Sequence, residues 1–301
     1  MERSEPSSLL ARARSRTPGL TVAGTMPVSG STWSFVGATL PEAVRIYRAL
    51  GIGAADLIAV PGNPDTPMLA SEQILRRPRK LAREIMDLGA PVSNLNYNFA
   101  ANFHERAINH KDAGVRKRNR KDYRSVIEFC RACRIPSVTV LPGIAQEGWT
   151  REKALALTAE ELHHMSAMSR KEGITTTFEA HVGSILESPL DTLTFVQTNP
   201  ELKLTLDYGH FICLGYAQEE VDPLVPYTAH VHLRQAAPEK LQARWDEGTL
   251  DFTGIIGKLA SATYTGFLSL EYEHLEGWMD LDKADVFTET VKMRNLLRSL
   301  A

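Results

Sequence analysis

The sequence predicts a single (βα)8 barrel, and three observations support this fold class. Short runs rich in apolar and β-branched residues alternate with longer segments of helical periodicity, and this pairing occurs eight times. Strict alternation favours parallel strands joined by right-handed crossover connections. The 301 residues suffice for one barrel of about 250 residues with extensions, and no internal linker rich in Pro, Gly and Ser divides the chain. A doubly wound open sheet is the alternative architecture.

The predicted elements follow one another in regular order along the chain. We expect strands at 20–28, 54–60, 91–99, 137–143, 175–181, 203–209, 228–234 and 266–274. We expect helices at 40–50, 71–88, 117–134, 150–172, 189–198, 217–225, 251–261 and 282–300. Thr150 and Ser188 are placed to cap two of these helices. The connection 100–116 is the longest irregular one, and its length indicates a loop with a function, such as a lid.

Composition and charge limit the classes of partner. The chain is 43% apolar and 23% charged, with a formal net charge of −2. This balance lacks the broad positive field of proteins that bind nucleic acid or anionic membranes, so we expect a small-molecule substrate, no nucleic acid and no membrane. The locally basic stretch 115–124 is interpreted as the solvated start of a helix. No window approaches the ~18 consecutive apolar residues of a membrane span.

The N-terminus and the cysteines give expectations about domains and location. Residues 1–19 contain arginines and serines together with Glu2 and Glu5, and they lack the apolar core of a secretory signal. We interpret them as a flexible tail, with an organelle transit peptide as the alternative, and assign 20–301 to the barrel domain. The three cysteines are too few and too unevenly spaced for a disulfide framework, which favours the cytoplasm.

The last four predicted strands each carry an ionisable residue near the carboxyl end. These residues are Glu179, Asp207, His232 and Glu271, separated by 28, 25 and 39 residues, about one strand–helix unit each. Active sites of such barrels lie at the carboxyl ends of the strands, so the four should converge. Buried charges need compensation, and a divalent cation would provide it. Oxygen-rich ligation with one imidazole favours Mn²⁺, Mg²⁺ or Co²⁺, with Zn²⁺ as an alternative. Ordinary turn or cap chemistry explains any one of them, but not four at matching positions.

Several segments together resemble the xylose isomerase-like TIM-barrel superfamily. They are TFEAH, LTLDYGHFICLG, AHVHLRQA, EGTLDFTGIIGKL and YTGFLSLEYEH, and the likeness covers about 35–300 in layout. Relatives include ketose 3-epimerases and inosose isomerases and dehydratases. The resemblance implies that Glu179, Asp207, His232 and Glu271 bind one divalent metal, Mn²⁺ being the first choice. It also implies that Glu179 and Glu271 form the acid–base pair and that His210, in an Asp-x-x-His pattern, contacts substrate.

The function implied is proton transfer next to the carbonyl of a sugar or keto-sugar. An enediolate would form, and return of the proton would give an isomerase or epimerase. A lyase or dehydratase on the same site is the alternative, for example one that eliminates an aglycone from a 3-keto (C-)glycoside. A non-catalytic sugar-binding or assembly subunit is an alternative of another class, and a repair nuclease ranks last. A homo-oligomer or association with a second subunit stays open.

Other residues near the predicted strand ends are candidates for substrate contacts. Where many relatives have His-x-Lys-Asp, this chain has Arg234 and Gln235. Arginine offers a charged fork to a carboxylate or to several sugar oxygens, but it cannot donate a catalytic proton. The predicted substrate contacts are His210, Arg234, His181 and Trp149.

Each of the four tryptophans follows a predicted strand, where its ring could stack on a sugar or cap the core; they are Trp33, Trp149, Trp245 and Trp278. Asn94, Asn96 and Asn98 share one face and could line the pocket, whereas His230 is expected to be a hydrogen-bonded core histidine.

Overall fold

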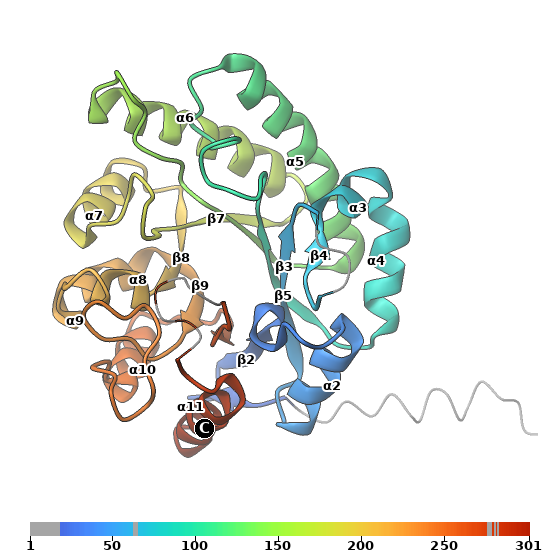
Figure 1. The fold of residues 1–301 in the computed structure, drawn as a ribbon, viewed down its shortest axis with the longest axis vertical. Coiled ribbons are helices and arrows are strands. Elements are labelled where there is room, and N and C mark those ends of the chain that lie inside the picture. Colours follow the sequence, from blue (N-terminus) through green and yellow to red (C-terminus); the bar gives the residue numbers. More distant parts are fainter. Residues whose placement is uncertain (1–18, 63–65, 276–278, 280, 282) are drawn as a thin grey trace, which may run out of the picture.

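Eight parallel strands form the closed centre of the molecule (Figure 1). The computed structural model describes all residues except 1–18, 63–65, 276–278, 280 and 282, so the predicted tail, save Gly19, and Trp278 lie outside the described residues. The barrel strands are β2 (Met26–Ser31), β3 (Ala54–Val60), β5 (Val92–Tyr97), β6 (Ser137–Val140), β7 (Thr175–Glu179), β8 (Lys203–Asp207), β9 (Thr228–Leu233) and β10 (Leu268–Leu270). The first strand β2 pairs in parallel with both β3 and the last strand β10. This closure confirms the (βα)8 barrel and excludes the open sheet.

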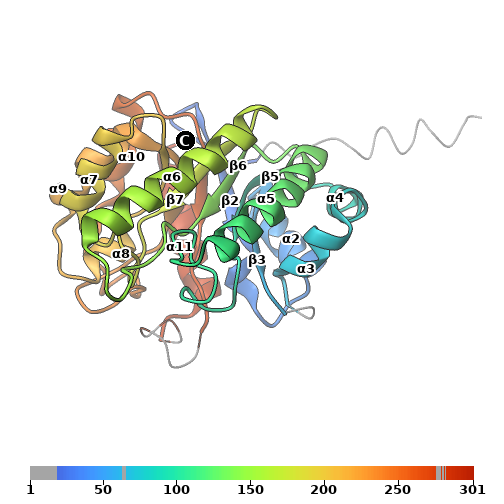
Figure 2. The same cartoon turned by 90° about the horizontal axis from the view of Figure 1, so that it is seen from above.

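Helices surround the barrel and cover its outer surface (Figure 1). The longer ones are α2 (Leu40–Ala49), α4 (Pro78–Asp87), α5 (Ala113–Cys133), α6 (Arg151–Arg170), α7 (Pro189–Thr198), α10 (Phe252–Ser261) and α11 (Val286–Ser299). Shorter elements are α3 (Ser71–Arg76), α8 (Gly209–Ile212), α9 (Gln218–Val221), and the 3-10 helices η1 (Thr32–Phe35) and η2 (Asp222–Tyr227). Two short strands lie outside the barrel: β1 (Thr21–Val22) pairs with β2, and β4 (Leu69–Ala70) pairs with β3. Figure 2 shows α5 and α6 side by side along one flank of the barrel.

Three of the differences between the observed and the expected element boundaries have a clear local cause. The expected strand 20–28 is a hairpin instead: β1 pairs antiparallel with β2 across a turn in which Ala23 and Gly24 have positive φ, and the barrel strand begins only at Met26. The expected helix 71–88 breaks between α3 and α4, because Pro78 has no N–H and forces Arg77 out of helical geometry. Helix α5 begins at Ala113, four residues early, because the Asp112 side chain accepts a hydrogen bond from the Gly114 N–H.

The barrel interior is polar beneath the carboxyl end of the strands. The hydroxyls of Thr139, Thr177 and Thr205 lie within 2.7–3.0 Å of one another, although β6 and β8 are not neighbours in the sheet. Thr139 also donates to Asn94 Oδ1 at 3.1 Å. All four side chains are fully buried. Because branched aliphatic residues usually fill such barrels, this hydroxyl network is a distinct platform below the candidate site.

Two further expectations concern cysteines and membranes. Cys130, Cys133 and Cys213 are buried and free, as the absence of a disulfide framework in the sequence predicted. Among the described residues, none of the helices has the length and apolarity needed to cross a bilayer.

Candidate metal and substrate site

The four residues predicted as metal ligands converge at the carboxyl end of the barrel. Glu179 and Asp207 are the last residues of β7 and β8, His232 lies near the end of β9, and Glu271 directly follows β10. One ligand atom from each lies within 4.8 Å of the corresponding atoms of the other three. All four residues are buried, each at most 3% exposed. The neighbouring parallel strands therefore deliver three carboxylates and one imidazole to a single point.

The contacts of His232 indicate that this group suits a cation. Its Nδ1 lies 2.8 Å from Glu179 Oε1 and 2.7 Å from Glu271 Oε2. A single N–H cannot serve two carboxylates equally well, whereas a divalent ion could bind one oxygen of each carboxylate at the same time. With ligand bonds of about 2.0–2.2 Å, donor atoms on opposite sides of an ion lie about 4 Å apart. The observed spacing of the four donor atoms is compatible with that requirement.

The electrostatics of the protein alone reflect the same crowding of charge. Burial raises the pKa of Glu179, and the attraction of His232 offsets this only in part. Burial also acts to raise the pKa of Glu271, but His232 and Arg234 outweigh it and the pKa is lowered. For His232, the penalty of burial is overcome by Glu271 and Glu179, so its pKa is raised. The cluster is therefore an anionic pocket that draws positive charge.

Asp207 is held in place by its own backbone turn and by Arg234. The Gly209 N–H donates to Asp207 Oδ1 at 2.7 Å, and Arg234 Nε and Nη2 donate to Oδ2 at 2.9 and 2.5 Å. A Cβ atom at position 209 would lie only 3.0 Å from that Oδ1, so glycine allows the close approach. The stretch that follows β8 thus bends sharply beside the candidate metal position.

Arg234 lies in the centre of the site, where the sequence placed a substrate contact. Its side chain is buried, and Nη1 lies 3.2 Å from Glu273 Oε1 while Nη2 lies 3.6 Å from Glu271 Oε2. Burial raises the pKa of Glu273 to about 8, even though Arg234 opposes this effect. The guanidinium therefore connects Asp207, a candidate ligand, to a second carboxyl group above β10.

His210 and His181 lie together beside this guanidinium. Their ring centroids are 4.0 Å apart, and Arg234 Nη2 lies 3.2 Å from His210 Nε2. Burial lowers the pKa of His181 to about 4 and also lowers that of His210. Burial therefore favours the neutral form of both rings, and a neutral imidazole can both donate a hydrogen bond to a hydroxyl group and accept one from it. The Phe103 ring packs edge-on against His181 at 4.9 Å.

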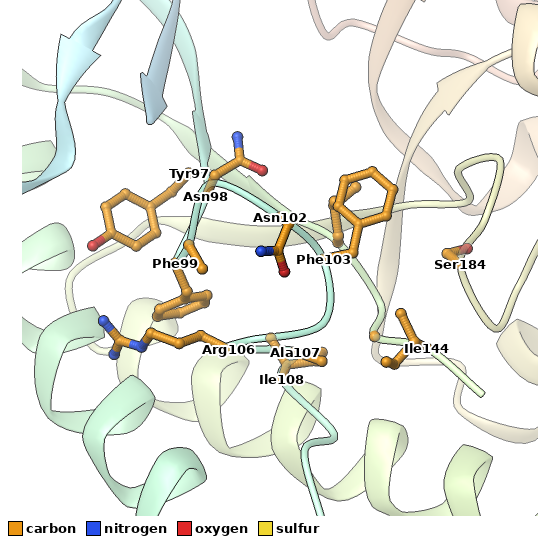
Figure 3. Close-up of a pocket in the computed structure, with 13 residues that line it drawn as sticks. Tyr97, Asn98, Phe99, Asn102, Phe103, Arg106, Ala107, Ile108, Ile144 and Ser184 are labelled. Atoms are coloured by element: carbon orange, nitrogen blue, oxygen red, sulfur yellow. The ribbon is translucent and has the colours of Figure 1, made fainter. Parts of the chain in front are cut away.

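A small hollow of about 30 Å³ lies beside Phe103 (Figure 3). It is lined by residues 97–108 in part, by Ile144 and by Ser184, whose Oγ accepts a hydrogen bond from the His181 N–H. From the predicted loop 100–116, the residues between Ala100 and Ile108 contribute to this lining. Its base is anchored, because Asn109 Nδ2 donates to the Ile144 carbonyl at 2.8 Å.

Trp149 is the predicted substrate contact that the structure places differently from the others. It precedes α6, its ring packs partly buried against the core, and Lys153 Nζ lies 4.0 Å from the ring centroid. His181, His210 and Arg234 are gathered around the cluster by direct contacts, while the contacts of Trp149 are with α6 and the core. Its role in substrate binding stays a prediction.

Sequence reasoning missed residues that support the candidate ligands. Asp56 on β3 is fully buried and accepts hydrogen bonds inside the barrel, and Ser31 Oγ donates to Glu271 Oε1 at 3.2 Å. The sequence signal that could have identified Asp56 is its place as a lone acidic residue in the otherwise apolar stretch 54–60. His230, expected as a hydrogen-bonded core histidine, has Nε2 at 2.6 Å from Asp56 Oδ2.

Comparison with known proteins found an isomerase and an epimerase among the proteins that this chain is similar to. The chain is 26% identical over 161 residues to the 2-oxo-tetronate isomerase of Haemophilus influenzae, spanning 51% of this chain and 61% of that protein. The structure of L-ribulose 3-epimerase superposes with a TM-score of 0.68 at 16% identity, covering 91% of this chain and 95% of the other.

A xylose isomerase-like TIM-barrel protein from Mycobacterium smegmatis, solved in complex with magnesium, is also similar. It superposes with a TM-score of 0.67 at 17% identity and covers 93% of this chain and 99% of its own. At sequence identities of 16% and 17%, these two structures support the fold of this chain and no more.

A family model described as xylose isomerase-like TIM barrel matches residues 44–294. The chain therefore belongs to the xylose isomerase-like TIM-barrel family.

Proposed function

We propose that the protein is a divalent-metal-dependent isomerase or epimerase that acts on a sugar or keto-sugar. The observation that carries the proposal is the buried convergence of Glu179, Asp207, His232 and Glu271, with donor atoms within 4.8 Å of one another. These residues would hold one divalent cation. When bound, the ion would polarise a substrate carbonyl and its neighbouring hydroxyl. The similarity to 2-oxo-tetronate isomerase and L-ribulose 3-epimerase supports the same reaction class.

Glu179 and Glu271 are proposed as the acid–base pair. They come from β7 and β10, the two outer members of the four strands that supply the cluster, and His232 lies between them with Nδ1 within 2.8 Å of both. A substrate carbon between these carboxylates could lose a proton to one and regain a proton from the other. Return to the same carbon from the opposite face inverts it, whereas return to the adjacent carbon, together with transfer of the hydroxyl proton to the former carbonyl oxygen, moves the carbonyl. Both outcomes pass through an enediolate.

Arg234, His210 and His181 are proposed to orient the substrate. The guanidinium of Arg234 is permanently charged. It lies beside the candidate ligands Asp207 and Glu271 and beside the imidazole of His210. This arrangement favours substrates with several oxygens and accommodates an oxidised sugar that carries a carboxylate. The relative named for 2-oxo-tetronate is consistent with that chemistry. Trp149 is proposed as a stacking surface at the outer end of the substrate.

The decisive experiment is deuterium incorporation from solvent. The purified protein, loaded with Mn²⁺, is incubated in D₂O with ketoses, inososes, 3-keto glycosides and 2-oxo sugar acids, and products are followed by NMR. We expect deuterium at the carbon next to a carbonyl in at least one class, with loss of exchange after chelation. Absence of exchange in every class, together with sugar binding, would instead indicate a non-catalytic binding subunit. Release of water or an aglycone would identify a lyase.

A further inference from the structure

A second buried charge cluster lies behind the candidate metal ligands. Asp56 on β3 is fully buried, and its Oδ2 lies 2.6 Å from His230 Nε2 and 3.3 Å from His232 Nε2. Its other oxygen, Oδ1, accepts a hydrogen bond from Asn94 Nδ2 at 3.1 Å. A buried carboxylate is costly unless its contacts compensate for lost hydration. Because β3 and β9 are separated by β2 and β10 in the sheet, Asp56 reaches these histidines from across the barrel.

The two nitrogens of His232 face different groups. Nδ1 faces the carboxylates of Glu179 and Glu271 at 2.8 and 2.7 Å. Nε2 faces Asp56, yet among the described residues it has no partner with full hydrogen-bond geometry. The imidazole stands between an anionic pocket in front and a single carboxylate behind.

We propose that Asp56 is a positioning residue that selects the metal-binding nitrogen of His232. By accepting a hydrogen bond from Nε2–H, it would leave the Nδ1 lone pair directed at a divalent cation held with Glu179, Asp207 and Glu271. A carboxylate behind a ligating histidine fixes its tautomer and orientation and increases its basicity. The inference rests on the proposed metal site, and it adds a residue from the opposite side of the barrel to it.

The surroundings of Asp56 fix its position. Asn94 donates to Asp56 through Nδ2, and Asn94 Oδ1 in turn accepts from Ser137 at 2.9 Å and from Thr139 at 3.1 Å. His230 approaches the Oδ2 atom and packs edge-on against His232, with ring centroids 5.2 Å apart. These contacts connect the His232 ring to β3, β5 and β6. Residues outside the four strands that carry the candidate ligands would thus control the geometry of the site.

Metal affinity measures this role without depending on turnover. The dissociation constant for Mn²⁺ is determined by calorimetry for the wild type and for Asp56→Ala, Asp56→Asn and His232→Ala. We expect Asp56→Ala to weaken binding about 10- to 100-fold, and Asp56→Asn, which keeps an acceptor oxygen of the same size, to recover part of that loss. Glu161→Ala is the matched control, because it removes another fully buried carboxylate, whose partners are Arg116 and Arg120 rather than residues of the site. It should bind Mn²⁺ within about twofold of the wild type.

The wild-type protein gives a second readout that no variant can confound. In protein labelled with ¹⁵N-histidine and loaded with Zn²⁺, NMR should show His232 protonated at Nε2 and bound to metal through Nδ1. Ligation through Nε2 would overturn the proposal, as would Asp56→Ala with wild-type affinity while His232→Ala loses binding. If the wild type itself binds no divalent cation, the proposed function fails, and the role of Asp56 fails with it. These outcomes separate the two ideas.

Discussion

The ion pair of Arg234 inside the barrel and the ion pair of Arg151 on the outer helices differ in their exposure to water. Inside, the ion pair of Arg234 with Asp207 joins two side chains that are at most 2% exposed. Outside, the pair of Arg151 with Asp191 joins α6 and α7 at 2.8 Å, with 43% and 47% of the side chains exposed. The outer pair stays hydrated, whereas the inner charges have lost their water and depend on one another. Stability alone gives no reason to gather charges there, so their concentration inside indicates a functional site.

The largest effect that would test this contrast concerns catalysis by the inner carboxylates. Glu179→Gln and Glu271→Gln each preserve size but remove the ability to accept a proton. Under the proposed function we expect each change to lower kcat by about 10²–10⁴-fold, the usual contribution of a positioned acid or base. Steady-state kinetics on the substrate found by deuterium exchange provides the measurement.

Glu161→Gln is the matched control for these two substitutions. Glu161 lies on α6 with a fully buried side chain, but its partners are Arg116 at 3.1 Å and Arg120 at 3.5 Å, on the helices outside the barrel. Its loss should leave kcat within about twofold. If all three substitutions reduced turnover equally, burial of a glutamate rather than its place in the barrel would explain the result, and the contrast would be broken.

The next effect concerns stability and the inner cation. Arg234→Met leaves Asp207 and Glu273 buried without their counter-charge. Removal of one partner from a buried pair typically costs about 3–5 kcal/mol of unfolding free energy. Urea unfolding in the presence of a chelator should show this loss, and saturating Mn²⁺ should narrow the gap because the ion also neutralises Asp207. A loss below about 1 kcal/mol without metal would show that the inner charges are hydrated after all.

The contrast also explains how much of the molecule could be predicted from its sequence. The fold class and the meeting of Glu179, Asp207, His232 and Glu271 follow from periodicity, because parallel strands align their carboxyl ends. Asp56 was missed because its partners come from β5 and β9, far along the chain, and no local pattern encodes contacts across a barrel. The proline at position 78 is a signal for a helix break, but residues on both sides of it have helical periodicity, and the sequence was therefore interpreted as one helix.

A smaller effect concerns the neutral polar groups beneath the site. Thr139→Val removes a hydroxyl that lies 2.7 Å from the Thr205 hydroxyl and 3.1 Å from Asn94 Oδ1. We expect a loss of about 1–2 kcal/mol in unfolding free energy, because a buried acceptor loses a donor. Thr194→Val on α7 is the control, since its hydroxyl donates to the Leu190 carbonyl at an exposed position. Equal losses for the two variants would contradict a special role for the interior network.

The smallest effect is expected for an arginine in the outer pair. Arg151→Ala should change the unfolding free energy by about 0–1 kcal/mol, because exposed ion pairs gain little over hydrated charges. Urea unfolding at low and high salt tests this, since screening should erase what difference exists. Arg234→Met leaves the buried Asp207 and Glu273 without a counter-charge, whereas Arg151→Ala leaves only the exposed Asp191, so the difference between the two variants reports mainly on burial. A cost at Arg151 as large as that at Arg234 would mean that the ion pair, and not its enclosure in the barrel, determines the energy.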